Sequence, residues 1–321
     1  MRFALMIEPQ MGMTYAEQLA VAQRAEAAGF ETLLRSDHYE SFPGDSDART
    51  TDAWAVVAGL ARDTQRIGLG VLVSPVGFRA PGNLAKLAVT VDEMSGGRLE
   101  VGFGAGWHAD EHRRHGFPFP EIGERAEMLE ETLEIVHGLW EAPDGWSFAG
   151  HHWTVEDSRF RPRPGDLRER AGGRPRILVG GQGTARSYRI AARYADEFNL
   201  SSTSPHDAVA KLAQLDAALR AVGRDPVTLT HSAMAGVLLG RDAAEVSRRE
   251  RDLQAAFAAD AEEWDAWFTV RRARWVLGAP DQAREVVRGF AAAGVERLVL
   301  QDFLPRDLEM IDLAAEALFA A

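Results

Sequence analysis

Short apolar segments alternate with longer amphipathic segments along almost the whole chain. Between the apolar segments the pattern is mostly helical, most clearly in "RAEMLEETLEIVHGLW", where Leu129, Leu133 and Val136 recur at helical spacing. The apolar segments that suit buried strands are residues 2–8, 31–36, 67–74, 98–104, 176–180, 196–201, 227–239 and 296–301. Eight strands that alternate with helices over 321 residues predict an α/β fold, a parallel (β/α)8 TIM barrel, rather than an open doubly wound sheet.

One type of junction recurs and supports this alternation. "AEAAGFETLLRS" and "FAAAGVERLVLQ", at opposite ends of the chain, both join an alanine-rich helix to a short apolar strand through a glycine. Gly29 and Gly294 stand where a helix ends on a left-handed residue. We expect one barrel domain over residues 1–321.

Two segments are too long to be simple connections. Residues 142–175 are rich in proline, glycine and arginine, and residues 240–279 look helical with an irregular end. We interpret both as insertions, because in a barrel the longer insertions often build the active-site face.

Composition narrows the possible functions. The chain has no cysteine, which excludes disulfides, thiolate nucleophiles and iron-sulfur clusters. Its net charge of -12 disfavours binding to nucleic acid or to an anionic membrane. No apolar run approaches the roughly 18 residues of a membrane span, and the apolar stretch at the start is too short for a signal peptide. We therefore expect a cytoplasmic protein.

Candidate chemistry begins where the second strand ends, in "RSDHY". Asp37 and His38 follow the strand directly, and functional residues of parallel barrels gather at the carboxyl ends of strands. An imidazole there can exchange a proton near neutral pH, and a neighbouring carboxylate can orient a ligand or the ring. The alternative interpretation is an ordinary Asp-His turn at the start of a loop.

The third and fourth strands end in unusual sequences. "VSPVGFRAPGN" requires a sharp turn, which is compatible with a bulge under a ligand or with ordinary turn residues. "GFGAGWHADEH" places glycines at 102, 104 and 106, which a flat ring system could approach, followed by Trp107 as an aromatic wall. Close helix packing would equally account for these glycines.

The same stretch also contains possible metal ligands. His108, His112 and His115, with Glu111 among them, have spacings that could hold zinc on a helix. The adjacent arginines and the following Gly116 are more typical of a solvated helix end. We expect no metal.

The fifth strand continues as "RILVGGQGTARSYR". Gly180, Gly181 and Gly183 precede an amphipathic helix, and free amides at such a helix start can bind phosphate. The spacing matches neither the Walker pattern nor the dinucleotide fingerprint.

Taken together, these segments resemble the bacterial luciferase-like family, and within it the branch of oxidoreductases that depend on the deazaflavin coenzyme F420. The resemblance covers roughly residues 1–240 and returns in "AAGVERLVLQ". The segments that carry it are "RSDHY", "TDAWAVVAGLARDTQRIGLGVLVSPVGFRAPGNLAK", "VDEMSGGRLEVGFGAGWHADEH", "ERAEMLEETLEIVHGLW" and "ILVGGQGTARSYRIAARYADEFN".

This resemblance implies a luciferase-like barrel with the deazaflavin ring in its mouth and the phosphate tail on the loop after the fifth strand. By matching position, His38 exchanges the proton and Asp37 contacts the ring. A bulge, often with a nonprolyl cis peptide, is implied at Leu72, Val73 and Ser74 behind the ring. The remaining implied cofactor contacts are Gly106, Trp107, Asp110, Gly180, Gly181 and Gly183.

The chain also departs from the family pattern. Some relatives place a glutamate, used as an acid or base, where this chain has Trp107, and residues 240–279 match no pattern that would identify a substrate. The leading hypothesis is hydride transfer between F420 and a small organic substrate, by a homodimer. The alternatives are an FMN-dependent monooxygenase on the same barrel and a noncatalytic flavin-binding barrel.

Overall fold

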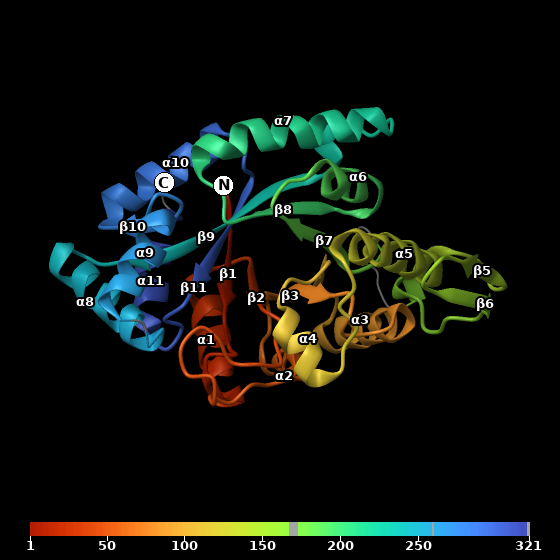
Figure 1. The fold of residues 1–321 in the computed structure, drawn as a ribbon, viewed down its shortest axis with the longest axis horizontal. Coiled ribbons are helices and arrows are strands. Elements are labelled where there is room, and N and C mark those ends of the chain that lie inside the picture. Colours follow the sequence, from red (N-terminus) through yellow and green to blue (C-terminus); the bar gives the residue numbers. More distant parts are fainter. Residues whose placement is uncertain (167–172, 259, 320–321) are drawn as a thin grey trace.

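The computed structural model describes residues 1–166, 173–258 and 260–319. Figure 1 shows the ribbon with its strands and helices labelled. Eight parallel strands pair in a closed barrel. In order around the barrel these strands are β1(Arg2–Ile7), β2(Thr32–Arg35), β3(Gly68–Pro75), β4(Leu99–Gly104), β7(Arg176–Gly181), β8(Glu197–Ser201), β9(Thr230–Leu239) and β11(Arg297–Asp302). Pairing of β8 with β9 and of β11 with β1 closes the ring. All eight predicted strands, and the predicted barrel, are confirmed.

Helices surround the barrel because each presents an apolar face to the strands. They are α1(Tyr15–Ala28), α2(Ala53–Asp63), α3(Pro81–Ser95), α5(Ile122–Glu141), α6(Ala185–Tyr194), α7(Pro205–Ala221), α10(Pro280–Ala292) and α11(Leu308–Leu318). Thr14 and Glu17 form a capping box at the start of α1, and Gly29 ends that helix with φ +92°. Gly294 has φ +93° after α10, as the repeated junction predicts.

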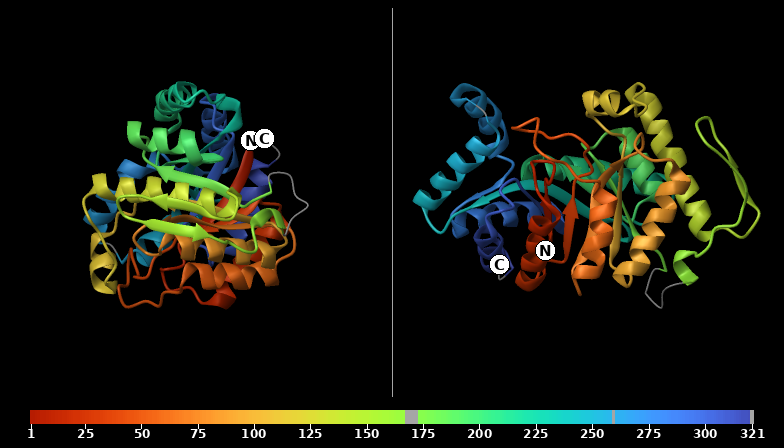
Figure 2. Two further views of the ribbon diagram at one scale, coloured as in Figure 1. Left: turned by 90° about the vertical axis from the view of Figure 1, so that its right-hand side faces the viewer. Right: turned by 90° about the horizontal axis from the view of Figure 1, so that it is seen from below.

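The two segments predicted as insertions differ in structure. Within 142–175, β5(Trp146–Ala149) and β6(Thr154–Ser158) form a hairpin that extends away from the barrel (Figure 2). Residues 167–172 of this segment lie outside the described residues. Within 240–279, α8(Ala243–Ala256) and α9(Ala261–Arg272) are followed by β10(Val276–Gly278), which pairs with the end of β9. The sequence did not predict β10 or the hairpin.

Aromatic side chains pack α9 against the carboxyl ends of β9 and β11. Trp264 and Trp267 stack at 5.6 Å between ring centroids, and Trp275 stacks on Phe303 at 5.6 Å. Trp264 and Trp275 are buried and form the core of this segment, whereas Trp267 packs against them and is only partly buried.

A buried ionic cluster fills the amino-terminal end of the barrel. The Arg297 guanidinium lies 2.7 Å from Oε2 of Glu100 and 3.0 Å from Oε2 of Glu197. Burial alone would lower the pKa of Arg297, but the adjacent carboxylates outweigh it and raise the pKa. This end of the barrel is therefore closed by paired charges, whereas the carboxyl end remains open.

No helix in the described ranges is both long enough and apolar enough to span a bilayer.

Candidate active site

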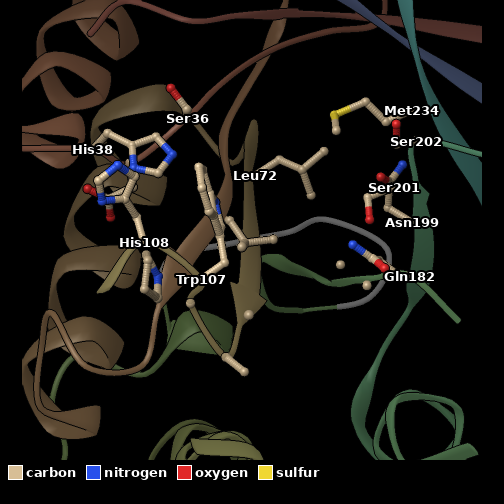
Figure 3. A pocket seen from close by; sticks show the side chains of 18 of the residues that line it. Ser36, His38, Leu72, Trp107, His108, Gln182, Asn199, Ser201, Ser202 and Met234 are labelled. Carbon is tan, nitrogen blue, oxygen red and sulfur yellow. The ribbon is translucent and has the colours of Figure 1, made fainter. Parts of the chain in front are cut away.

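A cavity of about 1040 Å³ opens at the carboxyl ends of the strands. It is lined by residues from all eight barrel strands or the loops that follow them, together with parts of α4(Ala109–His115), α5, α6 and α9. Figure 3 shows Ser36, His38 and His108 on one side, Asn199, Ser201 and Met234 on the other, and Leu72 and Trp107 between them. This volume lies at the upper end of the range typical of small-molecule sites.

His38 lies at the cavity wall and is held by Glu111. Its Nδ1 is 3.0 Å from Oε2 of Glu111, a residue in the first turn of α4 whose side chain is fully buried. The imidazole edge packs against Phe42, with ring centroids 4.5 Å apart. A carboxylate on Nδ1 favours the tautomer in which Nδ1 carries the proton, so Nε2 is left as an acceptor toward the cavity. The His38 side chain is 12% exposed.

Glu111 also ties the loop after β2 to α4. Its Oε1 accepts hydrogen bonds from the backbone N–H groups of Tyr39 and Glu40. Burial alone would raise the pKa of Glu111, but the hydrogen bonds from His38 and from the two amides outweigh it and keep the pKa below its usual value. Glu111 is therefore a fixed anion that positions both the ring and its loop.

Asp37 belongs to a second network, behind the cavity wall. Its carboxylate pairs with Arg79 and accepts a hydrogen bond of 2.8 Å from Oγ of Ser74. Arg79 also contacts Asp52, 2.8 Å away. Asp37 is only 1% exposed, but it forms part of the cavity wall. The guanidinium of Arg79 balances its charge.

The predicted bulge at the end of β3 is present. The register between β3 and β4 shifts between Val71 and Ser74, and the Leu72–Val73 peptide is cis. The Val73 side chain fills the space next to Gly104 and Gly180: a Cβ at Gly104 would collide with it, and a Cβ at Gly180 would lie 2.8 Å from its Cγ1. These two glycines therefore make room for the Val73 side chain of the bulge, and both line the cavity.

The loop after β7 leads into α6 at the cavity edge. Thr184 caps the helix by accepting from the N–H of Ser187, and Gly180, Gly181 and Gln182 line the cavity before it. At Gly183, φ is +85° and a Cβ would collide with the Tyr188 hydroxyl. The backbone here can present amides at a helix start, as a phosphate site requires.

The structure brings most of the predicted site residues together, but not all. Those that line the cavity are Asp37, His38, Leu72, Val73, Gly106, Trp107, Gly180 and Gly181. Ser74, Asp110 and Gly183 do not line it. Ser74 is buried and accepts from the Trp54 indole, and Asp110 is exposed and pairs with Arg113. Trp107 is 66% exposed and forms an edge-to-face contact with His38.

The three histidines of α4 and its cap have separate partners. Nδ1 of His108 accepts from the N–H of Glu111, Nδ1 of His112 bonds the His108 carbonyl, and His115 lies near Glu40. The described ranges contain no group of three or more potential metal ligands.

Sequence reasoning missed several cavity residues. From the sequence alone, Glu111 is a candidate only as a metal ligand. The signal that could place it beside His38 is an acidic residue in the first turn of a helix that follows a barrel strand. Polar residues at the ends of the other strands were not singled out; they are Glu8, Gln10, Ser36, Asn199, Ser201 and Gln301.

Comparison with known proteins gives one family. The family model described as luciferase-like monooxygenase matches residues 1–297. An uncharacterized protein of Mycobacterium tuberculosis is 32% identical over 205 residues, which are 59% of this chain and 67% of that protein. A pyrimidine monooxygenase of Stutzerimonas stutzeri is 30% identical over 193 residues, 59% of this chain and 51% of that protein. An F420-dependent hydroxymycolic acid dehydrogenase of M. tuberculosis is 28% identical over 284 residues, 88% of this chain and 70% of that one.

Solved structures match the fold over the whole chain. An F420-dependent secondary alcohol dehydrogenase, in complex with an F420-acetone adduct, superimposes with a TM-score of 0.83 at 19% identity, covering 99% of this chain and 98% of that one. The monooxygenase RslO1 of Streptomyces bottropensis gives 0.80 at 24% identity, covering 100% and 99%. At these identities the likeness establishes the fold alone.

Proposed function

Because the chain belongs to the luciferase-like monooxygenase family, we propose that it is an oxidoreductase that transfers a hydride between coenzyme F420 and a small organic substrate. The observation that carries this proposal is the His38–Glu111 pair, which leaves one imidazole nitrogen directed to a large cavity. A positioned imidazole is the most common group for exchanging a proton in a reaction.

The residues present fit a deazaflavin or flavin. The cavity has the volume for a ring system with a tail, and the Val73 bulge together with Trp107 offers apolar surface for a flat ring. The capped start of α6, with the backbone of Gly180 and Gly181, would hold the phosphate of the tail.

The chain's own residues would act as follows. When bound, F420 supplies the carbon centre that gives or accepts the hydride. His38 Nε2 would take the proton of a substrate hydroxyl during oxidation, or return it to the oxygen during reduction. Glu111 would stabilise the imidazolium through Nδ1 and keep the ring oriented. Leu72 and Val73 would exclude water from one side of the ring.

A reduced-FMN monooxygenase is the second candidate. The pyrimidine monooxygenase of S. stutzeri is as similar to this chain, within its aligned half, as the F420-dependent dehydrogenase is over a longer span. Both activities need an apolar platform and a phosphate site, so the cavity alone does not separate them.

Side-by-side titration of the purified protein with oxidised F420 and with FMN tests the proposal. We expect F420 to bind in the micromolar range or tighter and FMN at least about tenfold more weakly, which corresponds to roughly 1.4 kcal/mol. Copurification of FMN without binding of F420 would establish the monooxygenase instead.

A further inference from the structure

Three carboxylates line the cavity, and one of them has no cation in direct contact within the described part of the chain. Asp37 pairs with Arg79, and Glu111 contacts His38. Glu8, at the end of β1, forms no ion pair within the described part of the chain, although it is 5% exposed. The buried Arg35 of β2 attracts Glu8 electrostatically, but its N–H groups donate to uncharged groups of Ser36, Gln18 and Thr51. A buried carboxylate with no cation in direct contact is costly, so its position beside an open cavity is informative.

Neutral amides fix the Glu8 carboxylate in place. Oε2 accepts a hydrogen bond of 2.8 Å from Nε2 of Gln10, and Oε1 accepts one of 2.5 Å from Nε2 of Gln301. Gln10 is oriented in turn, because its Oε1 accepts from the Ser36 hydroxyl at 2.7 Å. The row crosses three neighbouring strands, β11, β1 and β2, and all four residues line the cavity.

This row leaves Glu8 able to accept more hydrogen bonds. An ionised carboxylate has about four lone-pair sites, and the two amides occupy two of them. A molecule in the cavity that donates hydrogen bonds can reach the others. If it also carries positive charge, it brings a cation into direct contact with Glu8, in addition to the longer-range attraction from Arg35.

The arginines of the cavity do not compete for Glu8. Arg125 donates to the Pro120 carbonyl, and Arg186 donates to the Gly123 carbonyl, both on the side of α5 and α6. Arg271 donates to the Trp267 carbonyl and stacks over that indole, with 4.3 Å from its guanidinium carbon to the ring centroid. Apolar side chains from the same part of the barrel, Met6 of β1 and Phe303 after β11, also line the cavity.

We propose that Glu8 is a specificity-determining residue that binds a protonated amino group of the substrate. The body of the substrate would pack on apolar residues of β1, β9 and β11, and its reacting carbon would face His38 on the neighbouring strand. This inference rests on the proposed function, because it takes the molecule held at Glu8 to be the substrate of that reaction.

Three probes of one shape test this assignment: n-pentylammonium, 1-pentanol and pentanoate. Each is titrated at pH 7 into the protein without added cofactor, with binding followed by saturation-transfer NMR. The proteins are wild type, Glu8→Gln, Glu8→Asp and a control, Glu156→Gln, which makes the same charge change at an exposed position on the hairpin. We expect wild type and the control to bind the ammonium at least tenfold more tightly than either other probe.

In Glu8→Gln this preference should fall to within about twofold, and Glu8→Asp should keep the order of preference with weaker ammonium binding. Circular dichroism confirms that each variant is folded. Equal binding of the three probes to wild type, or a preference that survives in Glu8→Gln, would overturn the assignment. Titration of F420 and FMN into the same proteins keeps the two proposals apart, since loss of cofactor binding bears on the proposed function and loss of the ammonium preference bears on Glu8.

Discussion

The imidazole of His38 and the carboxylate of Glu111 lie 3.0 Å apart, although 73 residues separate them in the chain. One follows β2 and the other begins α4, so the barrel itself brings them together. The contact fixes which imidazole nitrogen is free, and that nitrogen is the one on the cavity side.

Replacing His38 with alanine should separate catalysis from binding. We expect turnover to fall about a hundredfold or more, because a positioned acid or base typically contributes 10²–10⁴-fold. Cofactor affinity should change by less than about threefold, since the ring contributes only one wall of the cavity. Steady-state kinetics and a cofactor titration measure the two effects, and unchanged turnover would remove His38 from the mechanism.

Replacing Glu111 with glutamine should destabilise the fold in a pH-dependent way. The pKa of Glu111 is lowered in the folded protein, so its contribution is complete above the unfolded value and disappears as the pH falls through the folded value. We expect a loss of about 2 kcal/mol in the free energy of unfolding near pH 7, and a smaller difference from wild type below about pH 4.5. Urea denaturation at pH 7, 5 and 4 measures this, and a difference independent of pH would contradict it.

Two adjacent glycines give a matched test of the bulge. A Cβ at Gly180 would lie 2.8 Å from Cγ1 of Val73, whereas a Cβ at Gly181 would meet Ser187 and Phe198 at 3.5 and 3.6 Å, which are ordinary contacts. Gly180→Ala should therefore displace Val73 and weaken cofactor binding about tenfold or more, while Gly181→Ala should change it less than threefold. Fluorescence titration measures both, and equal losses would show that the bulge does not support the cofactor.

Asp302 is a candidate for a stabilising substitution. It is fully buried at the end of β11, where burial raises its pKa to about 7, and its Oδ2 has no partner among the described residues. A raised pKa means that the folded state holds the proton more tightly, so the wild type loses stability as the pH rises from about 4 to about 7. Asp302→Asn should remove this loss, at most about 1.4 kcal/mol per pH unit in that window.

Thermal or urea unfolding of Asp302→Asn at pH 5 and pH 8 checks the expectation, with the exposed Asp281→Asn as the control. A stability difference from wild type that is the same at both pH values would show that Asp302 does not titrate in this range.

Chelators should leave both activity and unfolding temperature unchanged. His108, His112 and His115 each contact a different protein group, and the described ranges hold no group of three or more potential metal ligands. Metal analysis of protein purified without a histidine tag provides the check, and stoichiometric zinc would contradict the expectation.

The barrel could be predicted from sequence because its strands are continuous apolar runs separated by helical periodicity. A continuous apolar run indicates a strand that is buried on both faces. Eight repeats of such a strand followed by a helix are compatible with few α/β architectures. The hairpin β5–β6 and the short β10 lack that signal: the hairpin strands are half exposed, and β10 has only three residues.

The candidate site was only partly predictable. The position of His38 follows from where β2 ends, and the resemblance to the family implied the bulge at the end of β3. The partners of each side chain follow from neither. Asp37 faces Arg79, and Glu111 faces His38, across distances in the sequence that no local pattern encodes. Glu8 and Gln301 were missed for the same reason, because single polar residues at strand ends become a row only once the barrel closes.

The ion cluster around Arg297 and the cavity lie at opposite ends of the barrel. Arg297 bridges to Glu100 across 197 residues of chain, at the end of the barrel opposite His38. Because these charges join β4, β8 and β11 at the end of the barrel away from the cavity, we expect that α8 and α9 can be exchanged for those of a related barrel, provided that the buried cluster they share with β9 and β10 is kept. New substrate specificities could therefore be obtained by grafting the segments at the carboxyl ends of the strands, without redesigning the core of the barrel.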